Sequence, residues 1–532
     1  MTKKVAFARE ATGIVRELGV WDVFLISAAI ATLQPNFLWL FSWPDLTFPG
    51  SSPFWICTFA LAIVIPIGLV YVLLGASMPR SGGDYVYTSR ILRADIGFMS
   101  SFVVGMTILI VLGTDMMYMV STAVAPTISV AGVLFANPSL LDLAKVVSSP
   151  MNTFAVGAVL LILITGLAMT RVITATRITW VFMLLSILGG VITVGLLLGT
   201  TREAFISIWN TKMGSYATYD QLINIAKGLG WAPTSLSIWA SLSAMGFGMW
   251  LFYGWIFPAY VGGEVKRASR SMLFGIIGGI LFLWLFFWIV GELSWAVAGR
   301  EWISAVNWLA TNYPDKYPIP SYPWISFVTP LLTDNPILIW LMLISYISAW
   351  VANDIAKILC ATRIIFAWSF DRVVPHSLAN VSERFHAPTW AAVVTGIIAI
   401  ISLYVAIFTG IFGYYLNTAG MILIAYTIVS IAAIVFPFRR KEIFEASPSI
   451  VRTRVGGVPL ISIIGVISAG FSIYGSYFAL TTTILGPLNV ASYSTIAGLF
   501  ILGAIIYYFA KTYRSRREGI DLGLLIKEIP PE

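Results

Sequence analysis

The sequence is poor in charge, histidine and cysteine, and each shortage excludes a class of protein. Only 11% of its 532 residues are charged, whereas about a quarter are charged in a soluble globular domain. The two histidines, His376 and His386, lie in one loop between apolar segments, so neither a histidine–cysteine metal cluster nor a membrane-embedded histidine relay is expected. Cys57 and Cys360 lie within apolar segments, and no disulfide framework is expected. We expect no metal and no resident cofactor.

Long apolar segments take up most of the chain instead. Hydrophobic residues make up 58% of the sequence, and they recur in runs of roughly 20 residues, each long enough to cross a hydrocarbon core of about 30 Å as a helix. The predicted fold is therefore an all-α polytopic protein of the lipid bilayer. Twelve transmembrane helices are predicted, at residues 18–43, 53–78, 97–124, 152–170, 175–199, 233–262, 272–297, 337–362, 388–410, 412–437, 458–484 and 492–511.

The basic residues lie mostly on one side of these spans. About 26 of the 32 lysines and arginines fall in the loops that share a side with the N-terminus, which is the asymmetry typical of cytoplasmic loops. Both termini are therefore predicted to be cytoplasmic, in a multi-pass protein of the cell membrane. This placement also argues that the net charge of +8 does not serve nucleic-acid binding.

Spans 1 and 6 contain helix-breaking residues near their middles. Span 1 is interrupted by Gln34-Pro35-Asn36, and span 6 contains Gly254, Pro258 and the glycine pair 262–263. A single proline in a membrane helix is commonly a harmless kink. Paired breaks at corresponding places in two halves, however, indicate an inverted-repeat transporter with a central binding site. The sequence thus predicts that residues 34–36 form an unwound joint whose freed N–H and C=O groups face a substrate.

Three stretches resemble sequence features of the amino acid/polyamine/organocation (APC) permease family. The loop MPRSGGDYVYTSRIL (78–92) is similar to the family's Pro-x-Ser-Gly-Gly-x-Tyr signature. FYGWIFPAYVGGEVKRASRSM (252–272) resembles its broken helix followed by an acidic and basic run. ATRIIFAWSFDRVVPHSLANVSERFHAPTWA (361–391) resembles the segment before its ninth span. The order of these stretches along spans 1–9 makes the resemblance specific, whereas the last three spans match by hydropathy alone.

The resemblance implies a leucine-transporter-like fold. It consists of two inverted five-helix repeats, spans 1–5 and spans 6–10, with broken helices 1 and 6 and two extra C-terminal helices. The implied divisions are a cytoplasmic N-terminus (1–17), a first repeat (18–199), an extracellular loop (200–232), a second repeat (233–437), a cytoplasmic loop (438–457), spans 11 and 12 (458–511) and a cytoplasmic tail (512–532).

The resemblance also implies a substrate site at the two breaks. Members of the family typically carry Gly-Ser-Gly in span 1, where bare N–H groups hold a carboxylate, but this chain has Leu33-Gln34-Pro35 there. Because proline donates no hydrogen bond, the amides of Gln34 or Asn36 are the candidate replacements. The expected substrate-binding residues are Thr32, Leu33, Gln34, Pro35, Asn36, Trp250, Tyr253, Gly254 and Trp255.

Three interpretations of the energy source stay open, namely coupling to sodium, coupling to protons through a carboxylate, and exchange with no ion; coupling is expected to involve buried polar groups. Some relatives place a lysine in span 5 at the position that Ser186 occupies here. Asp354 lies roughly 13 Å inside span 8 and is the first candidate, with Asn353 beside it as an oxygen donor, unless it only pairs with Lys357 one turn away. Asp115, roughly 27 Å along its helix, is expected near the outer vestibule.

Glu264 is expected to form a solvated pair with Lys266 and Arg267, and otherwise to belong to an inner gate. Glu292 is expected near the outer end of its helix.

These features predict a permease for a small molecule, not an enzyme. The resemblance and the paired breaks imply a transporter for amino acids or related organic amines that works by alternating access. Because no G-x-x-x-x-G-K-[ST] loop for ATP is present, it is expected to be a secondary active transporter that draws its energy from an ion or solute gradient. The alternatives are the same fold with a polyamine, nucleobase or inorganic cation as cargo, or a transport-like sensor.

Overall fold

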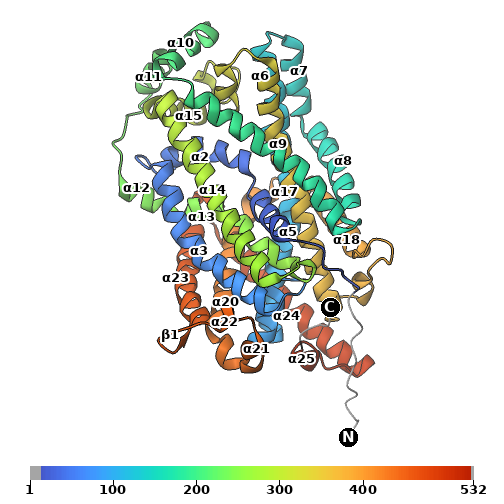
Figure 1. Cartoon of the computed structure of the whole chain (residues 1–532). Coiled ribbons are helices and arrows are strands. Elements are labelled where there is room, and N and C mark those ends of the chain that lie inside the picture. The colour runs from blue at the N-terminus through green and yellow to red at the C-terminus, as the bar shows by residue number, and fades with distance from the viewer. Residues whose placement is uncertain (1–12, 529–532) are drawn as a thin grey trace.

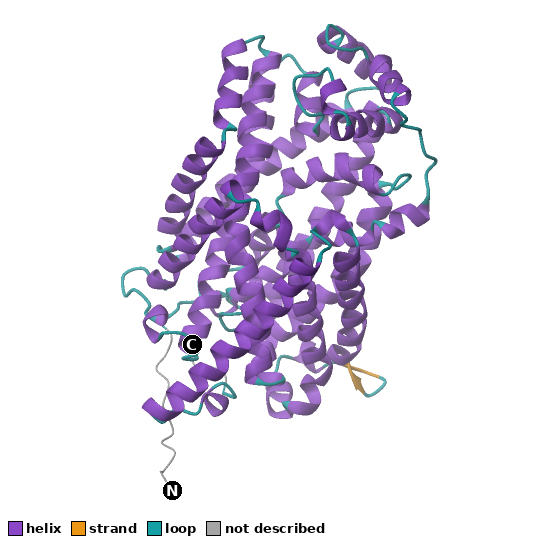
Figure 2. Ribbon diagram, turned by 180° about the vertical axis from the view of Figure 1, so that it is seen from behind, coloured by secondary structure: helices purple, strands orange, loops and turns teal. Residues whose placement is uncertain are grey.

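The computed structural model describes residues 13–528, and helices form nearly all of their regular structure (Figures 1 and 2). Eleven helical segments of this described part are long and apolar enough to cross a membrane. The predicted all-α polytopic class is therefore confirmed. These segments are Val20–Thr47 (α1, Val20–Ile30, with α2, Leu33–Thr47), α3 (Pro53–Ser77), Ala94–Leu134 (α5, Ala94–Met119; the π-helix η1, Val120–Val124; α6, Ala125–Leu134), α8 (Pro150–Ala168), α9 (Val172–Leu198), α14 (Ala268–Ala298), α17 (Pro336–Phe370), α18 (Thr389–Phe408), α20 (Thr418–Arg439), α23 (Leu460–Thr481) and α24 (Val490–Glu518).

The predicted sixth span, 233–262, is divided into short pieces and does not count among the eleven. They are α12 (Ile238–Ser243), α13 (Met245–Leu251) and the 3-10 helices η2 (Tyr253–Tyr260) and η3 (Gly262–Glu264). The third span is longer than the predicted 97–124, because α5 continues through η1 into α6 without a break. The outer parts of the predicted N-terminus and tail, residues 1–12 and 529–532, lie outside the described residues.

The bundle has two distinct ends (Figure 1). One end carries short elements near the last described helix, and we call it the terminal end: α4 (Asp84–Ile91), η6 (His376–Ala379), α21 (Lys441–Ala446), α22 (Ser449–Arg452), the hairpin of β1 (Arg454–Val455) and β2 (Val458–Pro459), and α25 (Leu522–Leu525). The opposite end, called the far end, carries α7 (Pro138–Val147), α10 (Arg202–Met213), α11 (Tyr219–Gly228), α15 (Arg300–Asn312), η4 (Pro314–Lys316), α16 (Ile325–Val328), η5 (Thr329–Leu332), α19 (Ile411–Tyr415) and η7 (Thr483–Leu485).

The centre of the bundle is built around α17. This helix packs against α9, α5, α1 and η2, while α1 also packs against α14 and η2. Its buried face carries polar and charged side chains in successive turns, among them Asp354, Lys357 and Arg363. Charges inside a membrane protein are costly unless they pair, so their partners on the surrounding helices define the interior of this bundle.

Candidate functional site

The first span is broken between Ile30 and Leu33, slightly before the predicted joint. Thr32 has the left-handed dihedrals φ 48° and ψ 70°, which side chains other than glycine adopt at a cost. Pro35 accounts for the position, because its ring in a continuous helix would clash with the carbonyl four residues earlier, that of Ala31. Residues 34–36 therefore form the first turn of α2, where a missing N–H costs nothing. The prediction that they are themselves unwound is wrong.

The two side-chain amides of this turn bind protein groups. Asn36 Nδ2 donates to the carbonyl oxygens of Ala31 and, at 2.9 Å, of Leu251, so it joins the ends of the two broken helices. Gln34 Nε2 donates to the carbonyl of Ser186 on α9 at 2.8 Å. The breaks in spans 1 and 6 thus hold each other in place through buried hydrogen bonds.

The second break replaces α-helix with 3-10 helix from Tyr253 to Glu264, with Pro258 inside η2. Gly254 is required here for close packing, because a Cβ atom at this position would lie 2.4 Å from the carbonyl oxygen of Ser27 on α1. η2 can therefore lie directly on the last turn of α1. The predicted interruption of span 6 is confirmed, with 3-10 geometry in place of a fully unwound segment.

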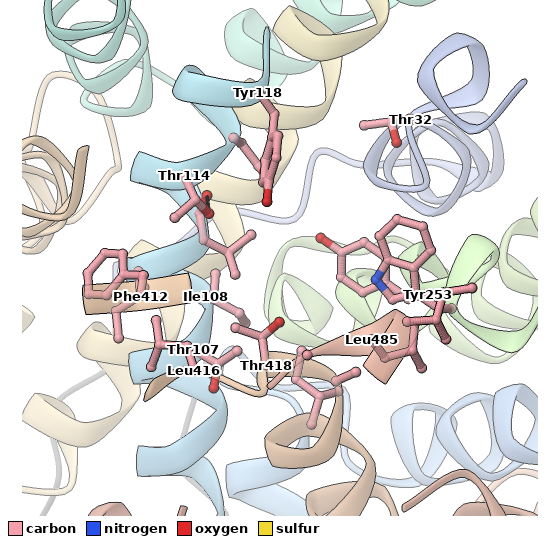
Figure 3. Close-up of a pocket in the computed structure, with 18 of the residues that line it drawn as sticks. Thr32, Thr107, Ile108, Thr114, Tyr118, Tyr253, Phe412, Leu416, Thr418 and Leu485 are labelled. Carbon is pink, nitrogen blue, oxygen red and sulfur yellow. Dashed lines mark hydrogen bonds between the residues drawn. The ribbon is translucent and has the colours of Figure 1, made fainter. Parts of the chain in front are cut away.

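A cavity of about 710 Å³ lies between the breaks and α5. Thr32 and Tyr253 face Thr114 and Tyr118 across it (Figure 3). Its apolar wall is rich in aromatic rings, namely Trp39, Trp43, Trp250, Trp255, Trp350, Phe412 and Tyr426. It also reaches residues 410–418 and 483–487, which connect α18 to α20 and α23 to α24 on the side away from α21. The cavity therefore lies toward the far end.

Two charged residues line the cavity, and they form an ion pair. Lys357 Nζ on α17 donates to Asp115 Oδ2 on α5, and it lies 5.5 Å from the centre of the Tyr253 ring. Asn353 Nδ2 donates both to Asp115 Oδ2, at 3.1 Å, and to Asp354 Oδ1, at 3.0 Å. The two carboxylates therefore share the Asn353 amide, while the Lys357 ammonium group binds Asp115.

The structure brings together some of the predicted site residues and separates others. Thr32, Trp250, Tyr253, Trp255 and Asp115 line the cavity. Leu33, Gln34, Pro35, Asn36, Gly254, Ser186, Asn353 and Asp354 lie around it without lining it. Ser186 accepts the Gln34 bond described above, through its backbone.

The structure decides the alternative that the sequence left open for Lys357, which pairs with Asp115 on α5 and not with Asp354 on its own helix. Asp115 lies near the middle of the helical segment Ala94–Leu134 and lines the cavity. Glu292 Oε1 accepts from Ser52 Oγ at 3.3 Å and Phe54 N at 3.2 Å, which agrees with its predicted place near the outer end of its helix.

Several cavity residues were missed by sequence reasoning. Trp39, Trp43, Tyr118 and Trp350 line the cavity, but in the sequence such residues are equally typical of the membrane interface. Lys357 had been considered only as a neighbour of Asp354. A lysine within an apolar span was itself a signal that could have identified it.

Below the cavity, toward the terminal end, the interior is closed by buried ion pairs. Arg363 Nε lies 2.7 Å from Glu264 Oε1, and Nη2 donates to Oε2 at 3.3 Å, with both side chains almost fully buried. Arg90 Nη2 lies 2.7 Å from Asp371 Oδ2. The prediction that Glu264 forms a solvated pair with Lys266 and Arg267 is therefore wrong, and its partner comes from α17.

Backbone contacts close the same end. Leu18 N donates to the Glu264 carbonyl at 2.9 Å, and Lys266 N donates to the Leu18 carbonyl at 2.8 Å, which ties the start of α1 to the end of η3. Tyr260 Oη donates to Asp84 Oδ2 at 3.1 Å. Burial raises the pKa of the Asp84 carboxyl to about 7, although the bonds from Tyr260 and the Tyr85 amide oppose this rise.

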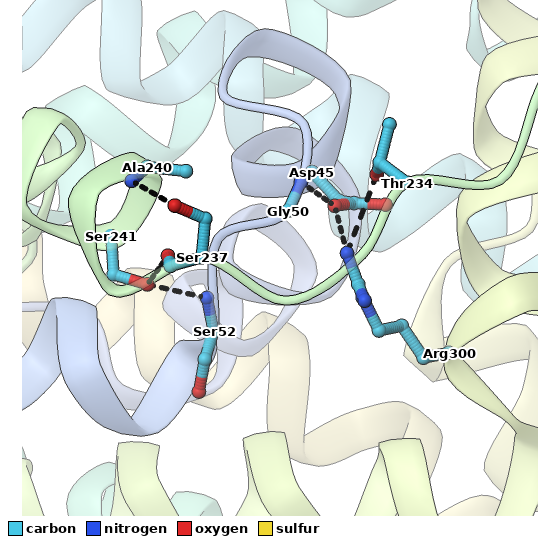
Figure 4. Close-up of polar contacts among 8 residues, drawn as sticks. All are labelled: Asp45, Gly50, Ser52, Thr234, Ser237, Ala240, Ser241 and Arg300. Atoms are coloured by element: carbon cyan, nitrogen blue, oxygen red, sulfur yellow. Dashed lines mark hydrogen bonds and ion pairs between the residues drawn. The ribbon is translucent and has the colours of Figure 1, made fainter.

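Polar contacts at the far end fix the entry to the broken sixth span (Figure 4). Asp45 Oδ1 at the end of α2 accepts from Arg300 Nη2 of α15 at 3.3 Å, and the same nitrogen lies 3.4 Å from Thr234 Oγ1. Ser52 N, before α3, donates to Ser241 Oγ of α12 at 2.9 Å. The far-end helices are thereby attached to the helices that carry both breaks.

Membrane-length helices surround a central cavity that lies toward the far end, and buried ion pairs close the terminal end. A family model described as amino acid permease matches residues 18–507, and the chain belongs to this family, which is part of the APC superfamily. A search of curated proteins returned no match for the chain.

Proposed function

We propose that the protein is a secondary active transporter that moves amino acids or related organic amines across the cell membrane by alternating access. In this proposal the chain crosses the membrane twelve times, with the divided α12–α13–η2 segment as the sixth span, in two inverted repeats of five spans. The terminal end is the cytoplasmic side. The protein carries out no covalent chemistry, and its energy comes from an ion or solute gradient.

One observation carries this proposal: the cavity touches both helix breaks, and buried contacts separate it from the terminal end. Thr32 at the first break and Tyr253 at the second line the same cavity. Toward the terminal end, the Glu264–Arg363 pair and the contact of Leu18 with Lys266 separate the cavity from that side. Such an arrangement supports an alternating-access cycle in which the breaks act as joints, and in this proposal it corresponds to the outward-facing state.

Asp354 supports coupling to protons. It is fully buried, one of its oxygens accepts from Asn353, and the other, Oδ2, has no hydrogen-bond partner among the described residues. The single nearby ammonium, Lys357, is engaged by Asp115. An ionised carboxylate without a cation is costly in such surroundings, so Asp354 holds a proton in this state and gives it up in another.

The function is tested by reconstituting the purified protein in liposomes and measuring uptake of a radiolabelled amino acid mixture under three conditions. These are an imposed pH gradient, an imposed sodium gradient, and no gradient with unlabelled amino acids inside. Accumulation driven by the pH gradient is expected. Accumulation with sodium alone would overturn proton coupling, and exchange without accumulation under either ion gradient would show that a solute gradient, not an ion gradient, drives transport. Uptake of polyamines, nucleobases or metal cations in place of amino acids would reject the proposed cargo.

A further inference from the structure

The Asp115–Lys357 pair is buried and also lines the cavity, and an ion pair with a purely structural role does not need to line a cavity. Among the described residues, these two are the charged groups that line the cavity. Their exposed fractions are only 6% and 2%, so the pair is shielded from water yet lies at the cavity wall. A buried pair contributes little net stability compared with apolar residues of the same size. Its position beside the cavity therefore points to recognition of something inside it.

A carboxylate that enters this cavity has few other partners. The backbone N–H groups of Leu33 and Gln34, at the start of α2, have no hydrogen-bond partner among the described residues. Both residues are buried and neither lines the cavity. Since these N–H groups do not reach the cavity and Lys357 is the cation among the described residues that line it, Lys357 is the group that can neutralise an anion there.

The charges balance for one chemical class. A zwitterion brings one ammonium and one carboxylate to a pair that is itself neutral, so each charge gains an opposite neighbour and no net charge is buried. Asp115 keeps its bond from Asn353 throughout. A simple amine would add a second cation beside Lys357, and a simple acid would add a second anion beside Asp115. Two like charges in direct contact repel each other strongly where the dielectric constant is low.

We propose, on the basis of the transport function above, that Asp115 binds the α-ammonium group and Lys357 the α-carboxylate of a zwitterionic amino acid. The ion pair opens and the substrate is inserted between its two partners. The side chain of the substrate lies against the tryptophan-rich wall formed by Trp39, Trp43 and Trp250. A wall of this kind selects a large apolar side chain, because such a side chain gains the most from leaving water.

Three probes with the same phenyl ring test the two charges one at a time. L-phenylalanine carries both the ammonium group and the carboxylate, 2-phenylethylamine carries the ammonium group alone, and 3-phenylpropionate carries the carboxylate alone. Their affinities are measured on the purified full-length protein by competition against radiolabelled L-phenylalanine. The wild-type protein is expected to bind L-phenylalanine about 10- to 100-fold more tightly than either of the other two, the range of a hydrogen bond to a charged group. Tighter binding of the amine or of the acid would overturn the proposal.

Two variants assign the two ends of the substrate. Lys357→Gln is expected to weaken L-phenylalanine by about 10- to 100-fold while the amine binds as before or better, and Asp115→Asn is expected to weaken L-phenylalanine and the amine but not the acid. These affinities are read by direct binding and thermal shift. The matched control is Lys145→Gln at the exposed pair with Asp142 on α7, which is expected to change nothing.

The double variant Asp115→Asn/Lys357→Gln guards against misfolding, because it leaves no unpaired charge behind. It is expected to elute and melt like the wild type and to lose binding of L-phenylalanine. Wild-type binding with unchanged probe preferences in the variants would overturn the inference and leave the transport function standing. If the wild type neither binds nor transports any of the twenty amino acids or 2-phenylethylamine, the proposed function itself fails.

Discussion

Glu264→Gln is expected to open the terminal end of the transporter. The substitution leaves Arg363 buried without a counter-ion, which costs about 3–5 kcal/mol when one partner of a buried pair is removed. This cost applies to the closed state alone, because both groups reach water once η3 and α17 separate. A change of about 3 kcal/mol shifts the closed-to-open equilibrium on the order of 100-fold toward open.

The chain contains its own probe of this opening. Cys360 is fully buried one turn before Arg363, and its Sγ donates to the Phe257 carbonyl of η2 at 3.4 Å. The other cysteine, Cys57, is buried in α3 and is replaced by serine for this assay. The labelling rate of Cys360 by N-ethylmaleimide follows the open fraction, so it is expected to rise by up to about 100-fold in Glu264→Gln.

Two further variants make the result decisive. Glu445→Gln removes one partner of a half-exposed pair with Arg454, which is worth about 0–1 kcal/mol, and should label like the wild type. Glu264→Gln/Arg363→Met removes both buried charges and should restore slow labelling. If Glu264→Gln is folded, as judged by elution and circular dichroism, and labels Cys360 at the wild-type rate, the pair does not hold this end closed.

The remaining predictions concern coupling, the joint and pH. Asp354→Asn removes the proposed proton carrier, so accumulation driven by a pH gradient should be lost while counterflow exchange persists. The control is Asp142→Asn at an exposed position. Unchanged accumulation in Asp354→Asn would contradict the coupling role. Asn36→Ala leaves the Leu251 carbonyl without its donor, at a cost of about 1–3 kcal/mol, so the melting temperature in detergent should fall. Asn152→Ala removes an exposed hydrogen bond to the Val146 carbonyl and should leave the melting temperature unchanged. The raised pKa of Asp84, about 7, means that the folded state binds a proton more tightly than the unfolded state. The proton on Asp84 adds at most about 4 kcal/mol to the free energy of unfolding, and this stabilisation is complete below pH 4 and is lost as the pH rises through 7. Asp84→Asn should therefore flatten the dependence of the melting temperature on pH in thermal scans, and an unchanged profile would refute this reasoning.

Much of the fold could be predicted because hydropathy and helix-breaking residues are local signals. Apolar length identified the spans, and Pro35 and Pro258 identified the two interruptions. The joint at Thr32 was placed slightly too late in the chain, because a proline disturbs the turn before it and not its own turn. Gly254 was expected among the substrate-binding residues, and its packing against Ser27 depends on a neighbouring helix that the sequence does not place.

The charged groups were harder to predict because their partners are distant in the chain. Glu264 stands next to Lys266 and Arg267, yet its partner Arg363 is 99 residues away. Lys357 is one turn from Asp354 but reaches Asp115 on α5, 242 residues away. Sequence neighbours suggest pairs within one helix, whereas the interior of a helical bundle is set by which faces meet, and a single sequence does not fix those faces.

The placement of ion pairs at the closed end is well suited to a structure that must open. An apolar seal of the same area would expose hydrophobic surface to water on opening, at about 25 cal/mol for each Å². A buried ion pair such as Glu264–Arg363 gains little net free energy when formed, because its attraction is largely offset by the cost of removing both charges from water. When the pair separates into water, that cost is recovered. The ion pair thus fixes the geometry of the closed terminal end and stabilises the closed state only slightly. A substrate whose affinities for the closed and open states differ modestly can therefore shift the transporter between them.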